Sequence, residues 1–206
     1  MGIKARVPER KPLIEAGMYV ARCYEIIHMG ETFNEKFGKM KDGMRLTWEL
    51  PTEMRDFDGV EKPIAVSKPY NLSMYGESHL RTDVEGWLGV KLSDEEADDY
   101  EQLDLLGKVC MLNIVHSEDG KYANVATVTP LMKGISLPPS FNEARAFDFE
   151  ENFDVNIEDR FPEFIWKKIK DSTQWKERIT SMEAEAVEPE MKHNAEEGSK
   201  ENDLPY

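Results

Sequence analysis

Residues 108–129 read KVCMLNIVHSEDGKYANVATVT, and this stretch decides the fold class. Two β-branched, apolar runs flank a polar turn centred on Asp119-Gly120. An Asp-Gly pair between alternating runs is a strong hairpin signal, because both turn positions must accept positive φ. In the first run Cys110, Leu112 and Ile114 share one face, and the opposite face is also largely apolar. The stretch therefore predicts a β-hairpin whose first strand is central in a sheet.

Three further strands are expected before this hairpin. Residues 17–33 alternate over one long strand, and residues 44–50 alternate over a second strand. Residues 62–75 contain a third strand. Between the second and the third strand, residues 51–61 are polar and are expected to form a loop that turns at Asp58-Gly59.

A helical insertion is expected between the third and the fourth strand. Ser78 can act as the N-cap of a helix over residues 78–88, and Ser93 starts a second capping signature, Ser-Asp-Glu-Glu. Five short strands with a helix between the third and the fourth match the OB-fold, a small, partly open Greek-key barrel. The predicted fold class is mainly β, with a five-stranded OB-fold barrel over residues 14–135.

The flanks of this barrel differ from it in composition. Residues 1–13 form a basic N-terminal arm, which is either a phosphate-binding arm or a terminus that is basic by chance. Residues 136–179 combine an acidic linker with a C-terminal helix, expected over residues 162–179, that packs on the barrel. The phenylalanine-containing stretch 141–159 could pack on the barrel, shield a groove or mediate self-association. Residues 180–206 hold few large apolar groups and are expected to form a disordered acidic tail.

The composition bounds the function. The formal net charge of −15 argues against a nucleic-acid partner, but residues 1–50 carry nine basic and seven acidic side chains, so a locally basic face is possible. Cys23 and Cys110 both lie in apolar strand patterns and are interpreted as buried hydrophobic residues. No apolar run approaches the ~20 residues that a membrane span needs. A cytoplasmic protein is expected.

Catalysis is not expected. The sequence has no GxSxG, no phosphate-binding glycine loop and no HExxH, and its four histidines have no ligand-like spacing. No cofactor or metal is predicted.

Binding of single-stranded nucleic acid is the class that the sequence favours. Such binding needs cations that follow the phosphates and aromatic faces on which bases stack. Lysines and aromatic residues interleave at three places, which an OB-fold would put in the first hairpin loop, in the third strand and in the last hairpin. Arg45 on the polar face of the second strand and Arg22 in the first strand are further phosphate candidates. The candidate DNA contacts are Arg22, Lys36, Phe37, Lys39, Lys41, Arg45, Lys68, Tyr70, Tyr75, Lys121 and Tyr122.

The order of these features resembles a known family. Residues 70–75 (YNLSMY), 78–87 (SHLRTDVEGW) and 106–108 (LGK), together with the hairpin, are similar to bacteriophage single-stranded DNA-binding proteins with an OB-fold. The resemblance implies sequence-independent binding of single-stranded DNA in phage DNA replication, recombination or repair. If a phage encodes the protein, the expected cytoplasm is that of the host cell. Arg81 and Trp87 are either DNA contacts or a structural signature of the insertion.

The last residues carry a separate resemblance. Residues 201–206 (ENDLPY) are similar to the acidic tip of bacterial single-stranded DNA-binding proteins, but tyrosine replaces the terminal phenylalanine and only two acids precede the leucine. The resemblance implies that replication or recombination enzymes bind this tip. The expected contacts are Glu201, Asp203, Leu204, Pro205 and Tyr206. Two alternatives stay open: an OB-fold interaction adaptor without direct DNA binding, and a non-catalytic subunit of an enzyme.

Overall fold

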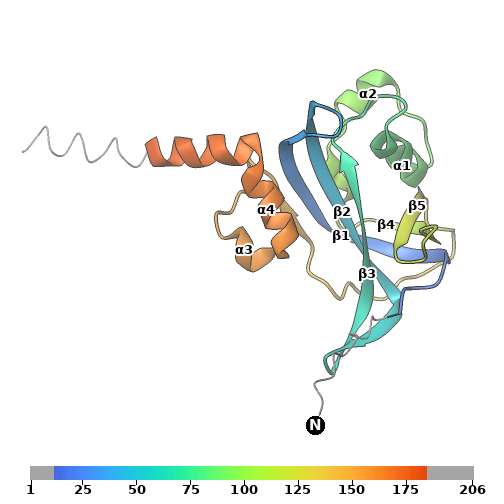
Figure 1. Ribbon diagram of the computed structural model, residues 1–206. Coiled ribbons are helices and arrows are strands. Elements are labelled where there is room, and N and C mark those ends of the chain that lie inside the picture. The colour runs from blue at the N-terminus through green and yellow to red at the C-terminus, as the bar shows by residue number, and fades with distance from the viewer. Residues whose placement is uncertain (1–11, 185–206) are drawn as a thin grey trace, which may run out of the picture. The chain divides into compact units, whose positions relative to one another are not determined.

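The computed structural model describes residues 12–184 (Figure 1). Most of the expected N-terminal arm and the predicted partner-binding tip, Glu201–Tyr206, lie outside the described residues. The strands are β1 (Gly17–Asn34), β2 (Lys39–Phe57), β3 (Val60–Asn71), β4 (Val109–His116), β5 (Ala123–Thr129) and β6 (Arg145–Phe147). The helices are α1 (His79–Leu88), α2 (Asp94–Asp98), α3 (Ile157–Arg160) and α4 (Glu163–Asp171), with a 3-10 helix at Gln102–Leu105.

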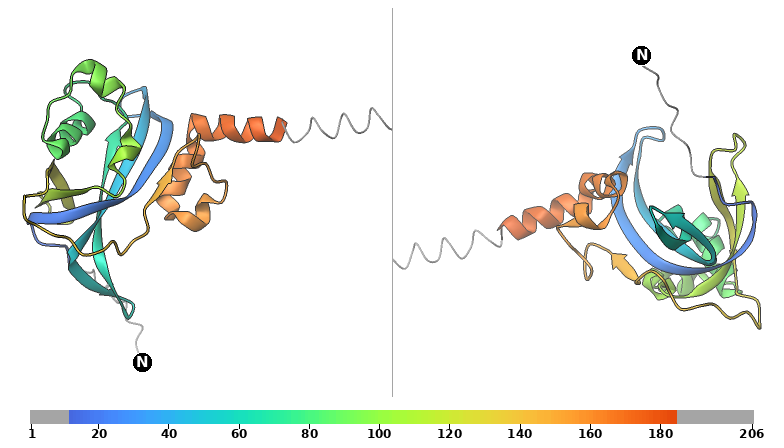
Figure 2. Two further views of the ribbon diagram at one scale, coloured as in Figure 1. Left: turned by 180° about the vertical axis from the view of Figure 1, so that it is seen from behind. Right: turned by 90° about the horizontal axis from the view of Figure 1, so that it is seen from below.

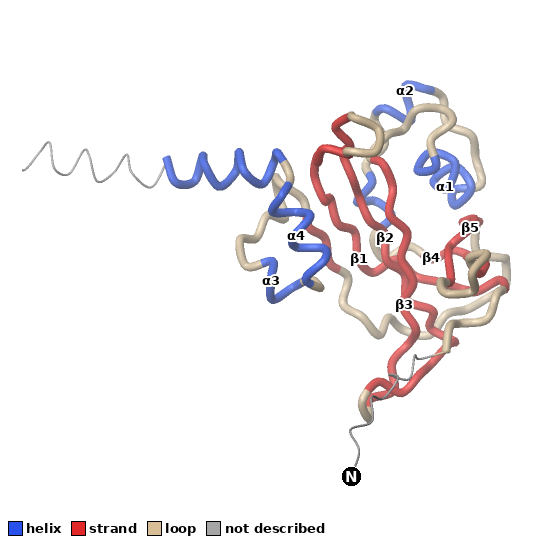
Figure 3. The backbone as a smooth tube through the Cα atoms, viewed as in Figure 1, coloured by secondary structure: helices blue, strands red, loops and turns tan. Residues whose placement is uncertain are grey.

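The fold is mainly β, as predicted, and the strands form one antiparallel sheet of six strands (Figure 3). The strand order is β3-β2-β1-β4-β5, and β6 pairs with β1. Within residues 12–184 the sheet is open, because β3 and β5 lie at the two ends of this order and no pairing joins them. The predicted helical insertion between the third and the fourth strand is confirmed.

The hairpin that decides the fold class is present as β4 and β5. β4 pairs with β1 on one side and with β5 on the other, so its predicted central place is confirmed. The turn differs from the expected one. Of the two residues Asp119 and Gly120, only Gly120 has a positive φ, of 64°. The loop is longer instead: Ser117 N donates to Tyr122 O at 2.9 Å, and Gly120 N donates to Ser117 O at 2.8 Å.

The prediction of a loop over residues 51–61 is wrong. β2 continues to Phe57 and β3 begins at Val60, so the two strands form a hairpin with a two-residue turn. Asp58 has a φ of 57° and Gly59 a φ of 86°, which is the conformation that such a turn requires. The polar residues form strands because the two arms satisfy each other's backbone groups, while side chains alternate between half-buried and exposed.

Helix α1 is held tightly against the sheet. The Ser78 hydroxyl accepts from Arg81 N at 3.2 Å and caps the first turn, as predicted. A Cβ on Gly86 would lie 2.6 Å from Val128 O in β5, so glycine allows a close approach of helix and strand. The Trp87 indole donates to Val109 O at 2.8 Å, and its ring centroid lies 6.0 Å from that of the fully buried Trp48.

The described chain divides into two compact units. Unit 1 holds residues 12–26 and 45–146, and unit 2 holds residues 27–44 and 147–184, so β1 and β2 contribute to both. This division differs from the expected boundaries at residues 14–135 and 136–179. The core of unit 1 includes Trp48, both free cysteines and the apolar face of β4. The prediction that Cys23 and Cys110 are buried hydrophobic residues is confirmed.

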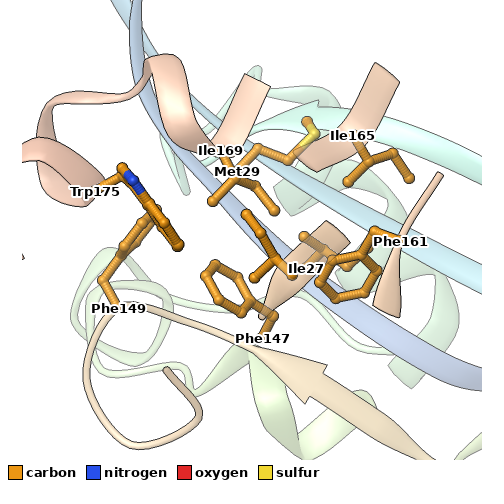
Figure 4. Close-up of a cluster of buried hydrophobic side chains, with 9 residues drawn as sticks. Ile27, Met29, Phe147, Phe149, Phe161, Ile165, Ile169 and Trp175 are labelled. Atoms are coloured by element: carbon orange, nitrogen blue, oxygen red, sulfur yellow. The ribbon is translucent and has the colours of Figure 1, made fainter. Parts of the chain in front are cut away.

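Unit 2 has its own apolar core (Figure 4). Ile27 and Met29 of β1 form one cluster with aromatic side chains from β6 and from the acidic stretch after it. The Phe147 ring meets the Phe149 ring edge-on at 5.4 Å and the Phe161 ring at 5.9 Å. The other buried members are Ile157, Ile165, Ile169 and Trp175. Of the roles considered for residues 141–159, Phe147 and Phe149 therefore have the packing role, against β1.

The expected single helix over residues 162–179 is interrupted. Helix α4 ends at Asp171, and a second helix covers residues 173–184. Ser172 between them has extended backbone, with a ψ of 157°. Its hydroxyl accepts from Trp175 N at 3.2 Å and so caps the second helix. Residues 180–184 are thus helical, although disorder was expected from residue 180. No helix in the described part of the chain has the length and apolar character needed to cross a membrane.

Candidate nucleic-acid interface

The turn between β1 and β2 exposes large apolar side chains. Phe33 is 60% exposed, Phe37 is 67% exposed and Met40 is 47% exposed. Gly38 has a φ of 60°, and Phe37 N donates to Asn34 O at 3.2 Å, so the chain reverses within residues 34–39. We call residues 33–41 the β1–β2 tip. Aromatic rings that a fold leaves in water at a hairpin end are typical of a binding surface.

Cations surround these rings. Lys36, Lys39 and Lys41 are exposed, and Lys36 Nζ lies 5.5 Å from the centroid of the Phe37 ring. The predicted contacts Lys36, Phe37, Lys39 and Lys41 are therefore brought together in the β1–β2 tip. Phe33 and Met40 were missed. The signal for Phe33 was its place at the end of an alternating strand next to a lysine-rich turn.

The strands below the tip are fixed by a side-chain pair. His28 Nε2 lies 2.8 Å from Asp42 Oδ1, which joins β1 to β2. The His28 ring also meets Phe149 edge-on, with 5.1 Å between the ring centroids. The parts of β1 and β2 that lead into the β1–β2 tip therefore pack against the core of unit 2.

The second hairpin end, between β4 and β5, carries one exposed ring. Tyr122 is 64% exposed, as a base-stacking contact requires. Lys121 Nζ lies 2.9 Å from Asp119 Oδ2, and hydrogen bonds from Ser117 and Lys121 lower the pKa of Asp119. The charge of Lys121 is therefore partly offset by its neighbour.

Tyr70 does not have the place that was predicted for it. It is only 4% exposed, and its hydroxyl donates to Asp83 Oδ2 at 2.8 Å. Lys68 Nζ lies 2.5 Å from the same oxygen and 5.4 Å from the centroid of the Tyr70 ring. A buried ring cannot stack on a base, so Tyr70 is a structural residue, and the charge of Lys68 is used in an internal ion pair.

Tyr75 is exposed, but its surroundings are acidic. It is 74% exposed and borders a hollow that Glu77, Asp94 and Asp98 also line. Carboxylates at this hollow oppose the approach of phosphates. The ring is available for stacking, but the hollow beside it is not a phosphate site.

Arg81, at the base of that hollow, belongs to the fold. It donates to Glu85 Oε1 at 2.9 Å and to Asp94 Oδ1 at 2.7 Å. It also donates to two backbone carbonyls, Met74 O at 3.2 Å and Leu92 O at 2.5 Å. These bonds join both ends of α1 to the segments beside it, so of the two earlier interpretations of Arg81 the structure favours the structural one.

The two arginine candidates on β1 and β2 are both bonded within the fold. Arg22 Nη1 donates to Glu49 Oε1 at 3.2 Å, and Arg22 Nη2 donates to Pro138 O at 2.8 Å. Arg45 donates to the Ser67 hydroxyl, and burial lowers its pKa. Both arginines, which the sequence predicts as phosphate contacts, therefore make hydrogen bonds inside the fold.

The irregular connection between β5 and β6 is pinned to β1 and β2 at its far end (Figure 2). Glu49, which is 0% exposed, accepts from Ser140 Oγ at 3.1 Å, from Phe141 N at 3.3 Å, and from Asn142 N and Nδ2 at 2.9 Å each. Arg145 Nε donates to Glu25 Oε2 at 2.6 Å. We call residues 138–145 the strap.

No family model and no curated protein matches this chain. Among residues 12–184 no group of three histidine, cysteine, aspartate or glutamate side chains could hold a metal ion. The functional argument therefore depends on the geometry of the exposed aromatic and basic side chains.

Proposed function

We propose that this protein binds single-stranded DNA largely independently of sequence. The observation that carries the proposal is the β1–β2 tip, where Phe33 and Phe37 are exposed among three lysines. Each base that stacks on an aromatic ring contributes about 1–3 kcal/mol, and every base has such a face. Lysines without a fixed geometry follow phosphates without reading sequence. A tip of this kind suits a strand of any sequence.

The arrangement of strands supports a finer proposal for the fold. β1 pairs with both β2 and β4, β5 follows on β4, and a helix separates β3 from β4. An OB-fold has these neighbours, and its ligands lie near the loop between its first two strands and the loop between its last two. We therefore propose an OB-type sheet, and we propose the β1–β2 tip and Tyr122 each as a contact for single-stranded DNA.

The wider role follows from this binding. The protein would coat and protect single-stranded DNA during phage DNA replication, recombination or repair. Enzymes of these processes would be recruited through residues 201–206, because an aromatic ring beside carboxylates suits an apolar pocket with a basic rim. Deleting Leu204–Tyr206 is expected to leave DNA affinity unchanged and to abolish capture of such an enzyme.

A titration tests the DNA proposal. A fluorescein-labelled dT oligonucleotide is titrated with the full chain at several salt concentrations, and anisotropy is followed. Binding should weaken steeply as salt rises, because lysines displace counterions from the phosphates. Replacing Phe37 with Leu, and Lys36, Lys39 and Lys41 with Gln, should weaken binding by about tenfold or more.

A matched variant controls for exposed rings in general. The double variant Phe164→Leu, Lys168→Gln alters an exposed ring and an exposed lysine of α4. Phe164 is 55% exposed. This variant should leave the affinity unchanged. Absence of binding by the folded wild-type chain at low salt would overturn the proposal. Equal affinity of the tip variant and the wild type would overturn the assigned site.

A further inference from the structure

A groove runs along the outer side of β1 in unit 1. Two hollows there share Tyr24, Asn142 and Glu143 as lining residues. Arg22 and Phe141 line one of the hollows, and Arg145 lines the other. One wall of this groove is the strap, and the opposite wall is β1.

Aromatic rings lie on both walls. Phe141 on the strap is 51% exposed, and Tyr24 on β1 is half-buried. Burial raises the pKa of Tyr24 to about 12, so its phenol stays neutral well above physiological pH and does not repel an anion. Neither ring is among the contacts predicted from the sequence, because the strap brings them together across more than a hundred residues.

One arginine lines each hollow of the groove, and buried carboxylates hold both arginines. Arg22 is fixed by Glu49, and Arg145 by Glu25, which is 4% exposed. The side chain of Arg145 is 42% exposed, whereas that of Arg22 is 14% exposed. A carboxylate holds a guanidinium in one orientation while the guanidinium keeps its positive charge, so the exposed part of the Arg145 side chain presents a fixed cation to a second anion.

We propose that this groove holds one nucleotide of the bound single strand. Its base lies against Phe141 and Tyr24, and its phosphate meets Arg145, the more exposed of the two arginines. The inference rests on the proposed function and adds a contact outside the β1–β2 tip. Glu143 is an exposed carboxylate on the wall of both hollows, and it therefore opposes the phosphate and limits the affinity.

Glu49 positions the stacking ring without touching the nucleotide. It accepts hydrogen bonds from the backbone of Phe141 and Asn142, so it fixes the part of the strap that carries the Phe141 ring. A ring held in place before binding loses less conformational entropy when the base arrives.

The test uses the full chain and a dT oligonucleotide that carries one 5-iodo-deoxyuridine. Phe141→Leu should weaken binding about fivefold or more, because a stacking face is lost. Glu143→Gln should strengthen it several-fold. After irradiation, peptides from the wild-type complex should carry adducts at Phe141 or Tyr24. Phe164→Leu serves as the matched control and should change nothing.

The outcomes separate this inference from the proposed function. A wild-type chain that binds the oligonucleotide, with a Phe141→Leu affinity within twofold of it and adducts only at other residues, overturns the groove and leaves the proposed function intact. A folded wild-type chain that does not bind at all overturns both. A Phe141→Leu chain with an altered melting temperature is replaced by Phe141→Met, for which the same loss is expected.

Discussion

Tyr70 donates its hydroxyl to Asp83 Oδ2 at 2.8 Å, which links β3 to α1. Asp83 is 7% exposed, so the bond is shielded from water. Burial first, and then the charge of Asp83, raise the pKa of Tyr70 well above its ordinary value. The residue that the sequence offered as a base-stacking platform is instead part of the join between strand and helix.

Replacing Tyr70 with Phe separates these two roles. The free energy of unfolding should fall by about 1–2 kcal/mol, because Asp83 loses a buried donor. Affinity for single-stranded DNA should stay within twofold of the wild type, because the phenyl ring is buried in both chains. Urea titration and anisotropy measure the two quantities. A loss of affinity without a loss of stability would show that Tyr70 contacts the DNA.

Replacing Glu49 with Gln should release the strap. The Glu49 carboxylate accepts hydrogen bonds from four donors of the strap and from Arg22. In glutamine an NH2 donor replaces one of the two acceptor oxygens, so some of these bonds are lost. We expect a loss of about 2–4 kcal/mol of stability. We also expect faster hydrogen exchange at the amides of Phe141 and Asn142. Exchange rates equal to those of the wild type would show that the strap is held by other contacts.

Replacing Gly86 with Ala tests the close approach of α1 and β5. Alanine normally favours a helix over glycine by roughly 1 kcal/mol. Here the added Cβ would meet Val128 O at 2.6 Å, so the net effect should be a destabilisation of about 1–3 kcal/mol. Gly17→Ala is the control, because its Cβ would meet only ordinary contacts, the nearest being 3.6 Å away. Stabilisation by Gly86→Ala would mean that the helix can move away from the strand.

Glu85 should contribute to acid sensitivity. Lys91 and then Arg81 lower its pKa from 4.5 to about 2 in the folded chain. The unfolded chain takes up this proton at a higher pH than the folded chain does. The stabilisation is therefore fully present above pH 4.5 and is lost as the pH falls toward 2. Urea unfolding measures the free energy of unfolding at pH 6 and at pH 3, and this free energy should change less between the two pH values for Glu85→Gln than for the wild type. Glu95→Gln, on the exposed side of α2, is the control and should behave like the wild type.

Local patterns predicted much of the fold. The alternation of Cys110, Leu112 and Ile114 was sufficient for the central strand, since all three are buried. Ser78 was sufficient for the start of α1, because a capping bond is made within one turn. Lys36 and Phe37 were found because a turn places neighbours in sequence side by side.

Two of the misses came from partners distant in sequence. Tyr70 follows Lys-Pro and was predicted to stack on a base, but it is buried and bonded to Asp83 on a later helix. Phe147 lies in an acidic stretch, and its apolar partner Ile27 is 120 residues earlier. For both residues the deciding contact has no signature nearby. Residues 51–57 differ: they are polar, but the Asp58-Gly59 turn pairs them with β3, so the turn was a local signal for a strand.

The sharing of β1 and β2 between the two compact units limits how the chain can be dissected. A fragment that ends before Phe147 would keep Ile27 and Met29 but lose the aromatic side chains that cover them. Such a fragment would expose an apolar strip on β1 and aggregate, even though it retains every strand from β1 to β5. No single cut in the polypeptide yields either half intact, so the protein has to be expressed, purified and assayed as one piece.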